Sequence, residues 1–138
     1  TVTESPYRVT ADIISETCGQ SISHAGAWDL VRRLGERISA EEEHAVKQME
    51  AGQAEGKKEI PVLFEEMDGV WLCMQGKDHK KQKKQELKVF TMYEGWEAGN
   101  KESRLVNKVM LAGMESSSLF HEKREALIEK TYNVDEIQ

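Results

Sequence analysis

The length, charge and composition of the chain exclude several classes of protein. With 138 residues and a formal net charge of -6, the chain can bury a core but is too acidic to be coated in basic charge for nonspecific nucleic-acid binding. No apolar run approaches the roughly 18 residues of a membrane span, no start resembles a signal peptide, and Cys18 and Cys73 form neither a disulfide framework nor a zinc motif, so we expect a cytoplasmic protein with no membrane partner.

Two helices joined by a short turn are predicted at the start of the chain. Apolar residues recur at helical spacing from Tyr7 to Thr17, and Gly19 suits the left-handed residue that follows a helix. Ser23 is a suitable N-cap for the second helix. The apolar stripe of that helix consists of Ala27, Trp28, Val31, Leu34 and Ile38. The helical pattern continues to about Met49, after which glycines favour a linker.

Residues 1–56 are interpreted as a helix-turn-helix-like, DNA-binding segment. In that arrangement Ser23 and His24 would face the DNA groove at the start of the second helix. Arg32 and Arg33 would contact phosphates. An ordinary helical hairpin explains the same short pattern equally well, so both interpretations remain open.

The hydrophobic period changes from near 3.6 to 2 at about residue 57, where we place a domain boundary. A strand apolar on both faces is predicted for residues 60–74, as in a strand covered on both sides. A lysine-rich turn and a second strand at residues 87–93 complete a hairpin. A third strand at 106–114 and a helix at 117–132 follow. The predicted fold class is α+β.

Five lysines are predicted at the tip of this hairpin. They are Lys77, Lys80, Lys81, Lys83 and Lys84. A solvated turn that blocks edge-to-edge strand pairing accounts for them. A finger that contacts the DNA backbone accounts for them as well.

Asp68 interrupts the predicted buried strand. A buried carboxylate must be hydrogen-bonded, protonated or bound to a cation, because desolvation of an isolated charge is costly. The Asp-Gly pair also fits a turn, but the apolar run resumes at once, so a β-bulge at Gly69 would reconcile the two observations. Metal binding or catalysis by Asp68 is one hypothesis. Alternation places Glu65 on the opposite face from Asp68, which argues against a paired-carboxylate site within this strand.

The segments "VLFEEMDGVWLCMQGKD", "KKQELKVFTMYEGWE" and "SSSLFHEKREALIEKTY" resemble bacterial insertion-sequence transposases that are often described only as an uncharacterised protein family. Those proteins are related to mutator-type transposases of the DDE class. The resemblance implies a ribonuclease-H-like fold that begins with three antiparallel strands and a helix. It also implies that Asp68, on the first strand, is a catalytic residue and metal ligand, the first of three carboxylates that hold two Mg or Mn ions.

The resemblance further implies a second Asp on the strand after the last helix and a Glu much later, whereas this chain ends at "NVDEIQ". We therefore expect residues 57–138 to be a partial ribonuclease-H-like domain. The chain would bind transposon-end DNA but be inactive alone, with no tightly bound metal. An open edge on the first strand predicts a homodimer or a domain-swapped oligomer. The alternative is a stand-alone DNA-binding or regulatory protein, or a self-associating remnant without catalysis.

Overall fold

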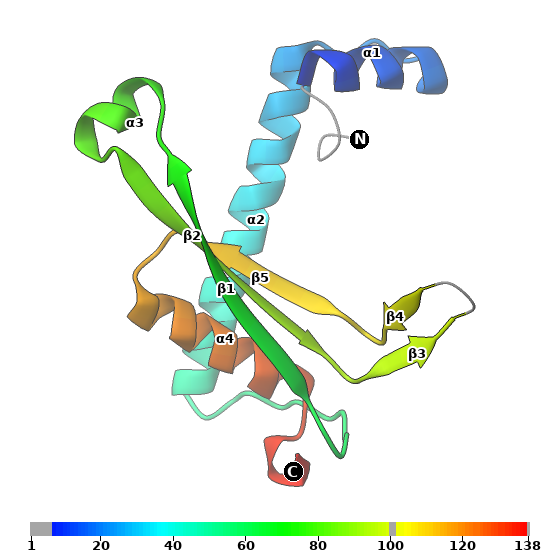
Figure 1. Cartoon of the computed structure of the whole chain (residues 1–138), viewed down its shortest axis with the longest axis vertical. Helices are drawn as coiled ribbons and strands as arrows, with labels where there is room; N and C mark the ends of the chain where they lie inside the picture. Colours follow the sequence, from blue (N-terminus) through cyan, green and yellow to red (C-terminus); the bar gives the residue numbers. More distant parts are fainter. Residues whose placement is uncertain (1–6, 100–101, 138) are drawn as a thin grey trace. The chain divides into compact units, whose positions relative to one another are not determined.

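The computed structural model describes residues 7–99 and 102–137. The chain divides into two compact units, Thr1–Glu42 and Glu43–Gln138, called the N-terminal and C-terminal units below. The division falls within helix α2 (His24–Glu50), upstream of the boundary predicted at residue 57. The helices precede an antiparallel sheet and a further helix, which confirms the α+β class (Figure 1).

Helix α1 (Tyr7–Cys18) and the first part of α2 form the N-terminal unit. Gly19 follows α1 with a φ of 65°, the left-handed conformation that only glycine adopts at little cost. The hydroxyl of Ser23 accepts a 3.0 Å hydrogen bond from the amide of Gly26 and so caps α2. The two predicted helices, their turn and the cap are confirmed.

Three antiparallel strands form the sheet of the C-terminal unit in the order β1-β2-β5. They are β1 (Phe64–Cys73), β2 (Lys84–Tyr93) and β5 (Val109–Gly113). Helix α4 (Ser117–Thr131) lies against one face of this sheet (Figure 1). The hydroxyl of Ser116 caps α4 by accepting a hydrogen bond from the amide of Leu119. The predicted order of three strands and a helix is therefore confirmed.

Several short elements were not predicted. Helix α3 (Gly76–Lys81) lies at the tip of the β1–β2 hairpin, where the sequence indicated only a turn (Figure 1). Strands β3 (Trp96–Ala98) and β4 (Ser103–Leu105) pair with each other in a second, two-stranded sheet. The 3₁₀ helix η1 (Val134–Glu136) follows α4. Such short elements lack the length that gives a hydrophobic period.

The main core lies between the sheet and α4. Phe90 and Met92 lie two positions apart on β2 and therefore on the same face of the sheet. Both are fully buried, as is Phe120 of α4. A second cluster joins α4 to the last turns of α2 and consists of Ala45, Val46 and Ala126, with Met49 at its edge. The end of α2 is therefore part of the C-terminal unit.

The prediction that the first strand is covered on both faces is wrong. Among the described residues β1 pairs only with β2, so it is an edge strand, and large side chains such as Val70 and Trp71 are exposed. Asp68 is exposed as well, so the cost of burying its charge does not arise. The register with β2 runs without interruption from Phe64 to Cys73, so the predicted bulge at Gly69 is also wrong.

Within residues 7–99 and 102–137 no helix is both long enough and apolar enough to span a membrane.

Candidate nucleic-acid interface and carboxylate site

Asp68 lies in the middle of β1, opposite Val89 of β2. Its Oδ1 accepts a 2.8 Å hydrogen bond from the amide of Gly69, its neighbour in the chain. Glu65 is held by α4, because Arg124 donates from Nε to Glu65 Oε2 at 3.0 Å. Glu65 is therefore not available as a partner of Asp68, in agreement with the strand alternation.

An open cavity of about 320 Å³ lies beside Asp68, between β1, β2 and the start of α4. Its polar lining consists of Asp68, Glu86, Lys88, Ser117 and His121. The sequence did not single out Glu86 or His121 as site residues. The hairpin register, which pairs Gly69 with Lys88 and Trp71 with Glu86, is the signal that could have identified the β2 members.

The two lysines in and beside this cavity are paired with glutamates. Lys88 Nζ lies 3.4 Å from Glu86 Oε2 and donates a 2.9 Å hydrogen bond to the backbone carbonyl of Glu115. Lys123 Nζ lies 2.7 Å from Glu115 Oε1. Burial raises the pKa of Glu115, but hydrogen bonding, chiefly from Lys123, outweighs this effect and holds the pKa below its ordinary value. Lys88 in the cavity wall and Lys123 beside it are thus each paired with a glutamate.

The implied metals require more ligands than this arrangement offers. A two-metal centre needs several carboxylates at coordinating distance. The part of the chain that the structure describes contains no group of three His, Cys, Asp or Glu side chains arranged to hold a metal ion. Asp68 and Glu86 both line the cavity, but the register places their side chains on opposite faces of the sheet, and Glu86 is paired with Lys88. These residues do not fit a two-metal centre, and we assign no catalytic step to them.

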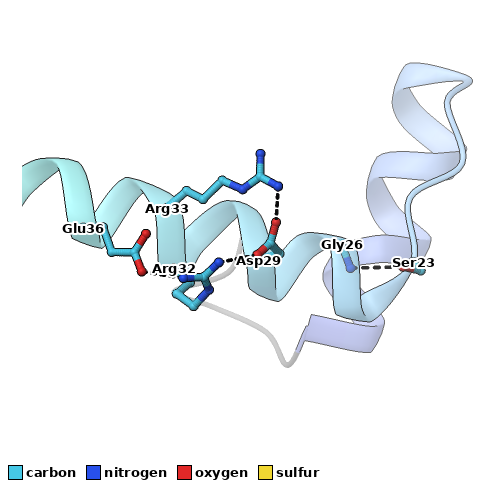
Figure 2. Close-up of polar contacts among 6 residues, drawn as sticks. All are labelled: Ser23, Gly26, Asp29, Arg32, Arg33 and Glu36. Carbon is cyan, nitrogen blue, oxygen red and sulfur yellow. Dashed lines mark hydrogen bonds and ion pairs between the residues drawn. The ribbon is translucent and has the colours of Figure 1, made fainter.

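The arginines predicted to contact phosphates are paired along α2. Figure 2 shows Arg32 between Asp29 and Glu36, and Arg33 beside Asp29. Arg32 Nη2 lies 2.8 Å from Asp29 Oδ1, and Arg33 Nη2 lies 2.7 Å from Asp29 Oδ2. Hydrogen bonding from Arg32 is the main cause that lowers the pKa of Asp29. The positive charge of both arginines is therefore largely compensated within the helix.

The other two predicted DNA-binding residues lie at the start of α2. The hydroxyl of Ser23 is occupied as the N-cap (Figure 2), while His24 is the first residue of the helix and is exposed. Both lie at the start of the helix that carries Arg32 and Arg33, about two to three turns before them.

The five lysines predicted at the hairpin tip differ from the arginines of α2 in having no ion-pair partner within the described residues. All five are exposed, and within the described residues none of them is in an ion pair. Backbone hydrogen bonds order the loop, from Met74 N–H to Lys83 O at 3.0 Å and from Gln82 N–H to Asp78 O at 2.9 Å. His79 Nδ1 lies 3.1 Å from Met74 O. The lysine cluster, as we call these five residues, is thus an ordered cationic surface.

Comparisons with known proteins give one match. The model of Uncharacterised protein family (UPF0236) matches residues 1–138. No curated protein and no solved structure is detectably similar to the chain.

Proposed function

The chain belongs to Uncharacterised protein family (UPF0236), and from the sequence resemblance described above we propose that it acts in DNA transposition as the N-terminal part of a DDE-type transposase of an insertion sequence. Its role is to bind DNA, and the lysine cluster is the main contact. The observation that carries this proposal is the lysine cluster itself, because five exposed lysines at an ordered hairpin tip stand against one aspartate, Asp78, in a chain of net charge -6.

The electrostatics of the two predicted DNA-binding regions favour the hairpin tip. A cation contributes to DNA affinity by replacing counterions on a phosphate. Arg32 and Arg33 would first have to give up their contacts with Asp29, whereas the lysines have no such intramolecular contact in the described residues. We therefore assign the arginines, with Ser23 and His24, a secondary role in DNA binding.

The hairpin also relates the lysine cluster to Asp68. Asp68 lies five positions before Cys73, the last residue of β1, which corresponds to about 17 Å at about 3.3 Å per residue. Along one DNA strand this distance corresponds to about five nucleotides, at about 3.4 Å each. A duplex that lies along β1 and is held at the hairpin tip would thus pass Asp68.

The position of Asp68 supports the assignment to the DDE class. It lies on the first of three antiparallel strands that precede a helix, the order that the sequence resemblance implies for a ribonuclease-H-like domain. In this proposal Asp68 is a single carboxylate that does not hold a metal ion by itself, and a Mg or Mn site would need further ligands from outside the described residues. We propose that the chain alone does not cleave DNA.

The proposal is tested by the fluorescence anisotropy of a labelled DNA duplex that carries a transposon end. The proteins are the wild type, a variant with all five lysines of the cluster changed to Gln, and Asp68→Asn. We expect the wild type and Asp68→Asn to bind alike at low salt and the lysine variant to bind at least tenfold more weakly. No binding by the wild type would contradict a DNA-binding role, and cleavage of the duplex by the chain with Mn²⁺ would contradict its inactivity.

The outer edge of β1 supports self-association as a second part of the proposal. An unpaired strand edge is a template for pairing with another chain, and among the described residues only β2 pairs with β1. The predicted homodimer or domain-swapped oligomer would use this edge. Slow hydrogen exchange of the outward amides of β1 at high protein concentration, and fast exchange on dilution, is the expected result.

A further inference from the structure

The distal half of the β1–β2 hairpin is a two-stranded arm. Strand β5 pairs with β2 only from Lys88 to Met92. Within the described residues, the segment of β2 from Lys84 to Leu87 therefore has β1 as its single neighbouring strand. Figure 1 shows this part of the hairpin extending past the end of β5 to helix α3. The lysine cluster lies at the end of this hairpin arm.

Trp71 lies on the hairpin arm and is 63% exposed. In residues 7–99 and 102–137 its ring neither stacks on another aromatic ring nor has a cation over its face. The other two tryptophans each have such a contact, Trp28 with Arg32 and Trp96 with Phe64. The ring of Trp71 is therefore a large apolar surface that is open to solvent.

The register of the hairpin places Trp71 on the same face as one member of the lysine cluster. Trp71 is opposite Glu86, and Cys73 is opposite Lys84. Because residues two apart on a strand share a face, Trp71 and Lys84 are diagonal neighbours across the two strands. Such neighbours lie about 7–8 Å apart, which aromatic and long side chains can span. A planar ring and a cation with no ion-pair partner among the described residues thus lie side by side.

The carboxylate of Glu86 leans away from the tip of the hairpin arm. A Cβ on Gly69 would overlap Oε1 of Glu86, so this carboxylate lies over Gly69, two positions before Trp71 on β1. Its other oxygen, Oε2, lies 3.4 Å from Nζ of Lys88, which compensates its charge. The side of Trp71 that faces Lys84 therefore keeps the positive character of the lysine cluster.

An aromatic ring beside cations is the combination that binds single-stranded nucleic acid. Unpaired bases of any sequence stack on the ring, and the cations contact the phosphates of the same strand. Lysines alone account for contacts with a duplex, whereas stacking on a protein ring requires bases that are unpaired. The exposure of Trp71 beside Lys84 therefore favours unpaired DNA at this arm.

We infer that the hairpin arm binds single-stranded DNA, with an unpaired base stacked on Trp71 and an adjoining phosphate held by Lys84. The other lysines of the cluster contact phosphates further along the same strand. The inference rests on the proposed DNA-binding role of the lysine cluster and extends that role from duplex DNA to unpaired DNA.

The test is the fluorescence anisotropy of two labelled DNAs at low salt, an oligothymidylate single strand and a blunt duplex. Trp71→Ala should weaken binding of the single strand by at least about fivefold, because it removes a base-stacking contact, and should leave binding of the duplex unchanged. Trp71→Phe should retain most of the affinity. The matched control is Trp96→Ala, which removes a tryptophan that is 59% exposed on β3, outside the arm. It should bind both DNAs like the wild type.

Tryptophan fluorescence tests the stacking itself. In Trp28→Phe/Trp96→Phe the single remaining tryptophan is Trp71, and the single strand should quench its emission more than the duplex does. If the wild type binds the duplex but Trp71→Ala binds the single strand as tightly as the wild type does, the inference is overturned and the proposed function stands. A wild type that binds neither DNA would overturn both. Circular dichroism checks that each variant is folded.

Discussion

The hydroxyl of Tyr132 donates a 2.8 Å hydrogen bond to Oε1 of Glu94 and so joins the end of α4 to the end of β2. Asn107 Nδ2 donates to the other carboxylate oxygen of Glu94 at 2.8 Å, and Lys58 forms an ion pair with the same group. Tyr132 is almost fully buried. This network connects four separate segments of the C-terminal unit around one carboxylate.

Tyr132→Phe should lower the free energy of unfolding by about 1.5–3 kcal/mol, because it removes a hydrogen bond to a charged and largely buried acceptor. Urea denaturation followed by circular dichroism measures the loss. Tyr7→Phe is the matched control, since Tyr7 is only half-buried and should change stability by less than about 0.5 kcal/mol. Equal losses in the two variants would show that the hydroxyl of Tyr132 has no special role.

The same network predicts the dependence of stability on pH. Burial raises the pKa of Glu94, but hydrogen bonds from Lys58, Asn107 and Tyr132 together outweigh it and leave the pKa lowered. The stabilisation by Glu94 is therefore present above its unfolded pKa of about 4.3 and is lost as the pH falls through the folded pKa. Unfolding experiments in urea between neutral and acidic pH should show this loss, and Glu94→Gln should make the acid limb shallower.

At alkaline pH the dependence has the opposite sign, because stability is lost as the pH rises. Burial, followed by the hydrogen bond to Glu94, raises the pKa of Tyr132 to about 12. Because the folded pKa lies above the unfolded value of about 10, this contribution is complete below pH of about 10 and is lost as the pH rises towards 12. Tyr132→Phe should remove this part of the alkaline decline, whereas an unchanged decline would assign it to other groups.

Gly56→Ala should destabilise the C-terminal unit strongly. The amide of Gly56 donates a 2.9 Å hydrogen bond to the carbonyl of Glu129, and a Cβ on Gly56 would overlap the carbonyl oxygens of Glu129 and Tyr132. Overpacking against backbone atoms costs about 1–3 kcal/mol, measurable by urea denaturation. In Gly69→Ala the overlap is with the end of the flexible Glu86 side chain, so this control should lose less. If Gly69→Ala lost more stability than Gly56→Ala, the close backbone contact at Gly56 would not be the cause of the loss.

Single lysines of the cluster should contribute equally to the salt dependence of DNA binding. In a plot of the logarithm of the binding constant against the logarithm of the salt concentration, each phosphate contact contributes about -0.9 to the slope. Five contacts therefore give a slope of about -4.5. Lys80→Gln or Lys83→Gln should each reduce its magnitude by about one unit, in titrations of duplex DNA over a range of salt concentrations. Arg33→Gln should reduce it less, because Arg33 is paired with Asp29. A larger effect of Arg33→Gln would make the helical unit the main contact.

Local signals in the sequence predicted local structure well. Gly19 and Ser23 marked the end of α1 and the start of α2 because their roles depend on backbone conformation and hydrogen bonding within a few residues. The ion pairs of Arg32 could also have been predicted, since Asp29 and Glu36 lie three and four positions away on the same helix. The order of the longer strands followed from the change of hydrophobic period.

Features that depend on neighbours distant in the sequence were not predictable in the same way. The apolar composition of β1 indicated burial, yet its exposure depends on whether another strand or layer covers it. His121 joined the cavity beside Asp68 only because α4 packs on the sheet in one particular register. The exposed middle of the α2 stripe was likewise invisible, since the sequence pattern is the same in covered and uncovered turns.

In the proposed function DNA lies along the β1–β2 hairpin, next to the lysine cluster and within reach of Asp68. Cys73 is exposed at the end of β1, between the two, and Cys18→Ser makes it the single attachment site for an iron chelate that cleaves nearby DNA. The labelled protein, mixed with an end-labelled duplex at low salt, should cut the bound strand, and the five-lysine variant should not. Binding with wild-type affinity but without cutting from Cys73 would show that DNA does not lie along this hairpin.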